Sequence, residues 1–245
     1  FFYDPNNLAG EFQTSSIDKI TKMIFHEGFY TQNKNMPTTS EDYNTPASFG
    51  FLMLSPDEKP PEYPSQKTVL DEIYSTINPN EQYWMGGGLS LAAQIGCIES
   101  LQYFLEKGAD PDQFDHKGWT ALMYAAQKGH IDCINMLLKK GADPNQLDHK
   151  GLTALMAAAN YGHIDCVKAL LENGADPNQF DHKGFTALIF AAQNEHIDCV
   201  DALLKKEADP NQSNSVGQTP LMAAADYGHI DCVKALLKNG ADPNQ

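Results

Sequence analysis

Cysteine is the residue in this sequence best suited to chemistry, because thiolates bind metals and act as nucleophiles. Four cysteines recur at intervals of 33 residues: Cys133, Cys166, Cys199 and Cys232. Histidines follow the same interval at His130, His163, His196 and His229. Equivalent positions of stacked repeats lie about 10 Å apart, whereas zinc needs four ligands within about 2.0–2.3 Å. We therefore predict no metal site and interpret these cysteines as small buried hydrophobes.

Known catalytic motifs are also missing from the sequence. All five cysteines lie within residues 97–232, and the segment before residue 82 offers only His26, without a thiol partner. The sequence contains no Gly-x-Ser-x-Gly elbow, no Walker loop and no His-Glu-x-x-His motif. Met85–Gly88 is rich in glycine but lacks the Lys-Ser/Thr that completes a phosphate cradle. The sequence thus predicts no catalytic residue, no cofactor and no enzyme activity.

Charge and composition narrow the classes of partner. The net charge is −15, and every basic residue apart from histidine is lysine. An acidic chain without arginine is a poor ligand for nucleic acids or anionic membranes, so we expect neither. No apolar run reaches the roughly 18 residues of a membrane span. The odd number of cysteines argues against a disulfide framework and favours a reducing, cytoplasmic location.

The elements that position these side chains form a repeat of 33 residues. Its register extends backwards from Asp115 to Gln82 and forwards to the last residue. We predict a non-repeating region at residues 1–81 and a repeat region at 82–245. The predicted units are 82–114, 115–147, 148–180, 181–213 and 214–245.

Each unit is predicted to contain two short helices. In the unit at 115–147, Thr120 is suited to cap a helix at Ala121–Lys128, which Gly129 would end. A second helix follows, with an apolar stripe at helical spacing formed by Ile131, Ile134, Leu137 and Leu138. Gly141 would end this helix. One unit alone cannot bury both helices, so stacking must supply the core.

These features resemble the ankyrin repeat family. The matching positions of one unit are Asp115, Gly118, Thr120, Leu122, Ala125, Ala126, Gly129, His130, Leu137, Leu138, Gly141, Ala142 and Asp143. The chain departs from the family in lacking the histidine of its usual Thr-Pro-Leu-His turn. The resemblance implies an all-α ankyrin-repeat solenoid with projecting hairpins and a concave face that binds protein partners. It also implies a structural role for the four repeated histidines, in the turn between helices, and an exposed position for the hairpin histidines His116, His149 and His182.

The region before the repeats is predicted to be helical and irregular. Ser15 or Ser16 is suited to cap a helix ending near Glu27, and a second helix is expected at about Lys67–Ile77. A proline-rich connector separates them and includes a short apolar stretch at Phe49–Leu54, either a strand or a plug. We expect this region to cap the stack, with a separate binding module as the alternative. Met85–Gly88 is expected to replace the first unit's turn, and further repeats or another domain are expected to follow Gln245.

Positions that the repeat does not dictate predict the partner site. By the family's geometry they line the hairpins and the concave face, where aromatic anchors favour binding. The candidate partner-binding residues are Trp119, Tyr124, Leu152, Tyr161, Phe185, Phe190 and Tyr227. For Tyr124 and Phe190, packing between neighbouring units is an equal alternative.

The fourth unit departs from its neighbours at two turns. Glu195 and Glu207 replace glycines that favour positive φ, at a cost of about 1 kcal/mol each. Neutral drift explains this, and an acidic rim for a basic partner is the alternative. We predict a monomeric protein-binding module. Its near-identical units look like those of bacterial or protist ankyrin proteins, some of which are effectors secreted into a host cytoplasm. The alternative is a targeting arm for an enzyme whose catalytic part lies outside this chain or in residues 1–81.

Overall fold

The computed structural model describes residues 82–115 and 117–245. The helices predicted near Glu27 and at Lys67–Ile77, and the stretch at Phe49–Leu54, lie outside these residues. The described part contains ten helices in five consecutive pairs. The first helices of the pairs are α3 (Gln82–Ile95), α5 (Ala121–Lys128), α7 (Ala154–Asn160), α9 (Ala187–Gln193) and α11 (Pro220–Asp226). The second helices are α4 (Ile98–Glu106), α6 (Ile131–Lys139), α8 (Ile164–Glu172), α10 (Ile197–Lys205) and α12 (Ile230–Lys238).

Threonine side chains start four of the first helices, as predicted. The hydroxyl of Thr120 accepts a hydrogen bond from the backbone N–H of Met123 at 3.3 Å. Equivalent bonds at the starts of α7, α9 and α11 measure 3.2–3.3 Å. Gly129 ends α5 in the left-handed conformation, with φ 76°. These local signals account for the observed bounds of α5.

The core lies between the two helices of each pair and between neighbouring pairs. Ala125 and Ala126 of α5 are fully buried, and such small residues allow adjacent first helices to approach closely. Four of the five second helices, α6 through α12, contribute a buried cysteine, which confirms the interpretation of these residues as small hydrophobes: Cys133, Cys166, Cys199 and Cys232. Large side chains such as Leu122 and Ile134 fill the remaining space. Neighbouring pairs thereby share one continuous core.

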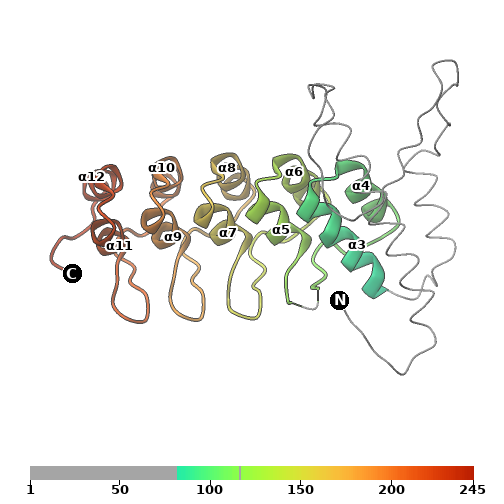
Figure 1. The fold of residues 1–245 in the computed structure, drawn as a ribbon, viewed down its shortest axis with the longest axis horizontal. Coiled ribbons are helices and arrows are strands. Elements are labelled where there is room, and N and C mark those ends of the chain that lie inside the picture. The colour runs from blue at the N-terminus through green and yellow to red at the C-terminus, as the bar shows by residue number, and fades with distance from the viewer. Residues whose placement is uncertain (1–81, 116) are drawn as a thin grey trace, which may run out of the picture. The chain divides into compact units, whose positions relative to one another are not determined.

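The pairs stack in register along the repeat region. First helices pack on first helices, from α3 through α11, and second helices pack on second helices, from α4 through α12. Figure 1 shows the two rows, with loops projecting from the row of first helices. Within the loop between α8 and α9, Phe180 and Thr186 form an antiparallel bridge. The loops therefore behave as short hairpins carried on a rigid two-layer support.

One prediction about the first pair is wrong. Met85–Gly88 lies inside α3 instead of forming a turn. A Cβ on Gly88 would come within 2.4 Å of the ring of Phe104, and a Cβ on Gly86 within 2.5 Å of the side chain of Gln113. The absence of side chains thus lets α4 and the following loop pack closely against α3. This gain in packing offsets the low helix propensity of glycine.

The two glutamates that replace glycine adopt the strained conformation predicted for them. Glu195 has φ 62° and Glu207 has φ 63°. Among the described residues, these are the non-glycine positions with positive φ. Both turns therefore keep the geometry of their glycine-containing counterparts, at a conformational cost.

Candidate functional site

The repeated histidines connect each pair of helices to the pair before it. The Nε2 atom of His130 lies 3.2 Å from the carbonyl oxygen of Gln94, and His163, His196 and His229 make equivalent contacts of 3.0–3.1 Å. The Nδ1 side of three of these rings lies against a glycine of the preceding turn, where a Cβ would come within 2.5–2.7 Å. The histidines are therefore part of the stacking interface, as the resemblance implied.

The buried cysteines are poorly suited to nucleophilic or metal chemistry. Burial raises the pKa of the Cys133 thiol to about 12 and those of Cys166 and Cys199 to about 11. The pKa of Cys232 is also raised, chiefly by burial. Because their pKa values are raised, these thiols stay protonated near neutral pH. They are therefore unreactive, since the thiolate is the form that attacks or binds a metal. No group of three metal-binding side chains lies close together within residues 82–115 and 117–245.

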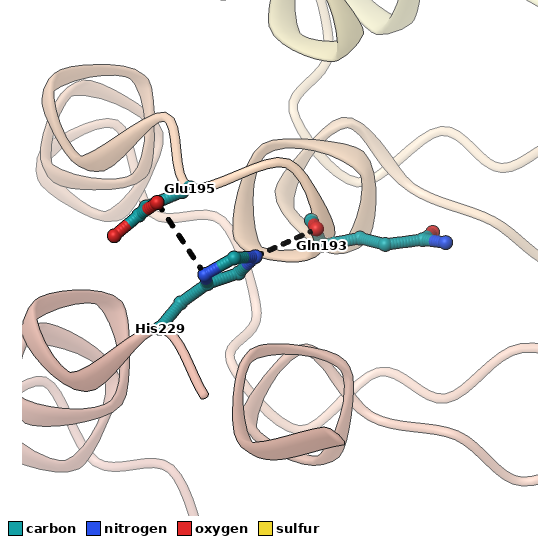
Figure 2. A network of polar contacts seen from close by, with 3 residues as sticks. All are labelled: Gln193, Glu195 and His229. Atoms are coloured by element: carbon teal, nitrogen blue, oxygen red, sulfur yellow. Dashed lines mark hydrogen bonds and ion pairs between the residues drawn. The ribbon is translucent and has the colours of Figure 1, made fainter. Parts of the chain in front are cut away.

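Glu195 makes the fourth interhelical turn different from the others. Its Oε2 atom lies 3.6 Å from Nδ1 of His229, while Nε2 of the same ring contacts the carbonyl oxygen of Gln193 at 3.0 Å. Figure 2 shows the imidazole held between these two groups. The carboxylate remains 71% exposed, so its attraction to the histidine adds little stability. Glu195 thus presents a negative charge at the edge of the stack, beside the histidine.

The first aromatic pair bridges two hairpins. The indole N–H of Trp119 donates a hydrogen bond to Oδ2 of Asp148 in the next hairpin, at 3.1 Å. The ring of Tyr124 packs against the indole with a centroid distance of 5.1 Å. Its hydroxyl donates to Oδ2 of Asp115 at 2.6 Å, and burial together with this bond raises the tyrosine pKa. Tyr124 is buried and supports the half-buried Trp119 instead of forming surface itself.

The second aromatic pair lies two units further along the chain. Phe185 and Phe190 stack with centroids 5.3 Å apart and an interplanar angle of 25°. Both rings are half-buried, and Phe190 packs on the core. The corresponding side chains of the intervening unit are the smaller Leu152 and Ala157, which are also half-buried. The predicted residues of these hairpins therefore form packed supports with partly exposed faces.

Two tyrosines of the predicted set are the most exposed. Tyr161 and Tyr227 are 51% and 59% exposed. Each ring stacks on the histidine two residues later, at centroid distances of 6.4 and 5.9 Å. Each hydroxyl accepts a hydrogen bond of 3.3 Å from a glutamine of the preceding unit. These rings are accessible but held in one orientation.

A comparison with protein families decides the identity of this fold. The family model for ankyrin repeats (three copies) matches residues 89–181 and 173–245. The chain belongs to the ankyrin repeat family. The match confirms the predicted all-α ankyrin-repeat fold. Ankyrin repeats generally mediate protein–protein interaction and are typically non-catalytic. No curated protein matches the chain in sequence.

The ankyrin register identifies further surface residues that the sequence analysis missed. Ile95 occupies the position of Tyr161 two units earlier and is 39% exposed. An apolar residue before each hairpin aspartate is also exposed, at Phe114, Leu147 and Phe180. Both sets could have been found from the sequence, because they share the interval of 33 residues or a multiple of it.

None of the described helices combines the length and apolarity needed to cross a membrane.

Proposed function

We propose that this ankyrin chain binds a protein partner along the first helices and hairpins of the stack, on the concave face implied by the family. Tyr161 and Tyr227 carry the proposal, because they expose more than half of their surface while stacking on His163 and His229. An aromatic side chain fixed before binding loses little conformational entropy in a complex. Such residues are typical anchors of protein interfaces.

The remaining predicted residues either contact the partner directly or support a side chain that does. Trp119 and Phe185 present partly exposed rings on the hairpins, while Leu152 contributes apolar surface between them. Tyr124 and Phe190 act by fixing the rings of Trp119 and Phe185 through direct stacking. Together these residues form a row of side chains over three consecutive units, in addition to the more exposed tyrosines.

The experiment that tests this function compares capture of a partner by the parent chain and by a Tyr161→Ser, Tyr227→Ser variant. A matched control replaces two exposed apolar residues of α12, Ile230→Ser and Leu237→Ser, which are 65% and 44% exposed. Captured proteins are identified by mass spectrometry, and the strongest candidate is purified for a direct titration. We expect the tyrosine variant to bind at least tenfold more weakly than the control.

Equal binding by both variants would refute the assignment of these tyrosines as anchors. Thermal unfolding of each variant checks that the fold is intact, which is expected because both tyrosines lie largely outside the core. An oligomer measurement on the parent chain tests the predicted monomer.

A more specific role rests on sequence alone. The near-identical units, which resemble those of bacterial and protist ankyrin proteins, support the proposal of an effector that acts in a host cytoplasm. A secretion assay with the full-length protein tests it, and retention in the producing cell would contradict it. A basic group of the partner that contacts Glu195 and Glu207 is tested by replacing both with glutamine in the same titration. Binding should weaken and its dependence on salt should decrease, and unchanged binding would contradict it.

A further inference from the structure

Three consecutive hairpins carry the same pair of exposed side chains, one apolar and one cationic. The apolar members are Phe114, Leu147 and Phe180, which are 40%, 44% and 59% exposed. The cationic members are Lys117, Lys150 and Lys183, which lie three residues further along each hairpin and are exposed. We name these six residues the hairpin ridge.

The hairpins that carry the ridge are held rigidly. In the third unit, Oδ1 of the buried Asp148 accepts hydrogen bonds from the backbone N–H groups of Lys150 and Leu152, at 2.7 and 2.8 Å. Asp181 makes the same two bonds in the fourth unit, at 2.9 and 2.8 Å. The ridge side chains therefore project from loops whose backbone conformation is fixed before any partner arrives.

Neighbouring hairpins also contact each other, so the ridge is continuous. The backbone N–H of His182 donates to the carbonyl oxygen of Lys150 at 2.8 Å. The ring of His149 lies against Gly118, where a Cβ would come within 2.3 Å of it. Equivalent residues of adjacent units are about 10 Å apart, the usual separation of packed helices. A binding segment would thus meet one apolar and one cationic group in each step of about 10 Å.

Local charge distinguishes the ridge from the rest of this acidic protein. Within the described residues, no carboxylate forms an ion pair with Lys117, Lys150 or Lys183. The nearest aspartates in sequence are Asp115, Asp148 and Asp181, and each uses Oδ1 to bond the backbone of its own hairpin. Asp115 is half-buried, and the other two are buried. The lysines are consequently available to an external anion, although the whole chain has a net charge of −15.

The turns that precede the ridge do contain exposed aspartates. Asp143 and Asp176 accept hydrogen bonds from the backbone N–H groups of Asn145 and Asn178, each at 2.9 Å. These carboxylates cap their own turns, and they would repel an acidic ligand placed across them. A ligand of the ridge is therefore expected to follow the hairpin tips and to keep away from the preceding turns.

We propose that the hairpin ridge binds an extended, acidic segment of a partner protein. Apolar side chains of the segment contact Phe114, Leu147 and Phe180, and its carboxylates pair with the three lysines. A segment in the extended polyproline II conformation rises about 3.1 Å per residue and has three residues per turn, so every third side chain faces the ridge, in steps close to 10 Å. This inference rests on the proposed function as a protein-binding module, and it adds the chemistry and conformation of what is bound.

The probe for this proposal is a fluorescein-labelled peptide of three Leu-Glu-Ser repeats, titrated with the parent chain by fluorescence anisotropy. One comparison peptide carries lysine in place of glutamate, and another has the same composition with its leucines adjacent. We expect the acidic periodic peptide to bind most tightly, and its affinity to fall between 50 and 300 mM NaCl as the ion pairs are screened. Equal or tighter binding of the lysine peptide would overturn the proposal, and so would no binding up to 1 mM protein.

Charge variants locate the binding surface. The ridge variant is Lys117→Glu, Lys150→Glu, Lys183→Glu. Its matched control changes three exposed lysines of the second helices by the same total charge: Lys168→Glu, Lys205→Glu, Lys238→Glu. The ridge variant is expected to bind the acidic peptide roughly tenfold more weakly than the control, given typical energies of exposed ion pairs. Equal weakening in both variants would show a nonspecific charge effect and refute the ridge.

A third variant separates this proposal from the proposed function. Leu147→Ser with Phe180→Ser removes apolar ridge surface without changing charge, and it is expected to weaken peptide binding about fivefold. The Tyr161→Ser, Tyr227→Ser variant is expected to leave peptide binding unchanged. If partner capture depends on the tyrosines while no ridge variant alters peptide binding, the ridge proposal fails and the proposed function stands. Thermal unfolding and circular dichroism of each variant confirm that it is folded.

Discussion

Replacing Asp112 by asparagine is expected to stabilise the first units of the stack. In the later units an asparagine occupies this position, and it makes two hydrogen bonds to the next turn. For Asn145, the amide donates to the carbonyl oxygen of Gly174 at 3.0 Å, and Oδ1 accepts from the N–H of Asp176 at 2.8 Å. Asp112 keeps only the second bond, accepting from the N–H of Asp143 at 2.9 Å.

A carboxylate at this position also costs electrostatic energy. Burial raises the pKa of Asp112 above its ordinary value of 3.8, the bond from Asp143 opposes the shift, and the charges of Asp110 and Asp143 add to it. The repeat register places the carbonyl oxygen of Gly141 where an asparagine would donate its amide hydrogen. Asparagine supplies that donor and removes the charge. The added hydrogen bond is worth about 1 kcal/mol of unfolding free energy, or about 2–4 °C in Tm for a chain of this size.

The gain should depend on pH in a defined direction. A carboxyl group whose pKa is raised in the folded state binds protons more tightly there than in the unfolded state. The parent chain therefore loses stability from this group as pH rises from about 3.8 through the folded pKa, and the full penalty applies at neutral pH. Below about pH 4 the protonated Asp112 can itself donate a hydrogen bond. The advantage of asparagine is thus largest near pH 7 and shrinks toward pH 3.

Urea unfolding followed by circular dichroism at pH 7 and pH 3.5 measures this difference. Asp110→Asn is the matched control, because it removes a neighbouring charge without placing an amide opposite Gly141, and we expect it to give less than half of the gain. The reverse change in the next unit, Asn145→Asp, should destabilise by a similar amount. The reasoning is refuted if Asp112→Asn and Asp110→Asn are equally stable at pH 7, or if the gain grows at acid pH.

Three further predictions concern backbone strain, helix glycines and thiol reactivity. Glu195→Gly should raise the unfolding free energy by about 0.5–1 kcal/mol in urea titrations, since relief of positive φ exceeds the exposed attraction to His229; a loss would contradict this. Gly87→Ala should stabilise α3 by about 0.5–1 kcal/mol because nothing lies within 4 Å of the added Cβ. Gly88→Ala should destabilise the protein because its Cβ would crowd the ring of Phe104 in α4. Tm values that change in the same direction in both variants would contradict this. Iodoacetamide at pH 8 should label native protein at Cys97 alone, because burial raises the pKa of the other four thiols; mass spectrometry showing rapid labelling of those four would contradict it.

Helix positions were predictable from sequence wherever local chemistry and the repeat agree. Thr120 and Gly129 bound α5 as predicted, because each satisfies a requirement set within a few residues. The same local reasoning failed at Gly88, which prefers a turn in isolation. Its helical conformation is stabilised by Phe104, a contact across the helix pair that no local rule includes. Predictions from sequence thus failed where packing between helices decides conformation.

The candidate site shows the same division between local and distant contacts. Periodicity identified Trp119 and Tyr124 as positions left free by the repeat, and it left packing and partner contact as equal alternatives for Tyr124. Tyr124 is buried because its hydroxyl reaches Asp115, nine residues earlier. Trp119 is fixed by Asp148, 29 residues later in the next hairpin. A contact between units has no signature inside one unit, so the structure was needed to separate a supporting ring from a presenting one.

Repetition itself explains where function can be encoded in this chain. A side chain that recurs in every unit, such as the buried alanine that each first helix carries at the position of Ala125, is already required by the stacked core. Side chains that recur in only some units are free of that requirement. Ile95, Tyr161 and Tyr227 share one register position in alternate units and are all exposed, while Lys128 and Asn194 occupy it between them. A partner that binds Ile95, Tyr161 and Tyr227 must therefore place its contacting groups two units apart along the helices. A segment on the hairpin ridge must place its contacting groups one unit apart. The two steps differ by a factor of two, so periodic ligands of different spacing can distinguish binding at the two surfaces.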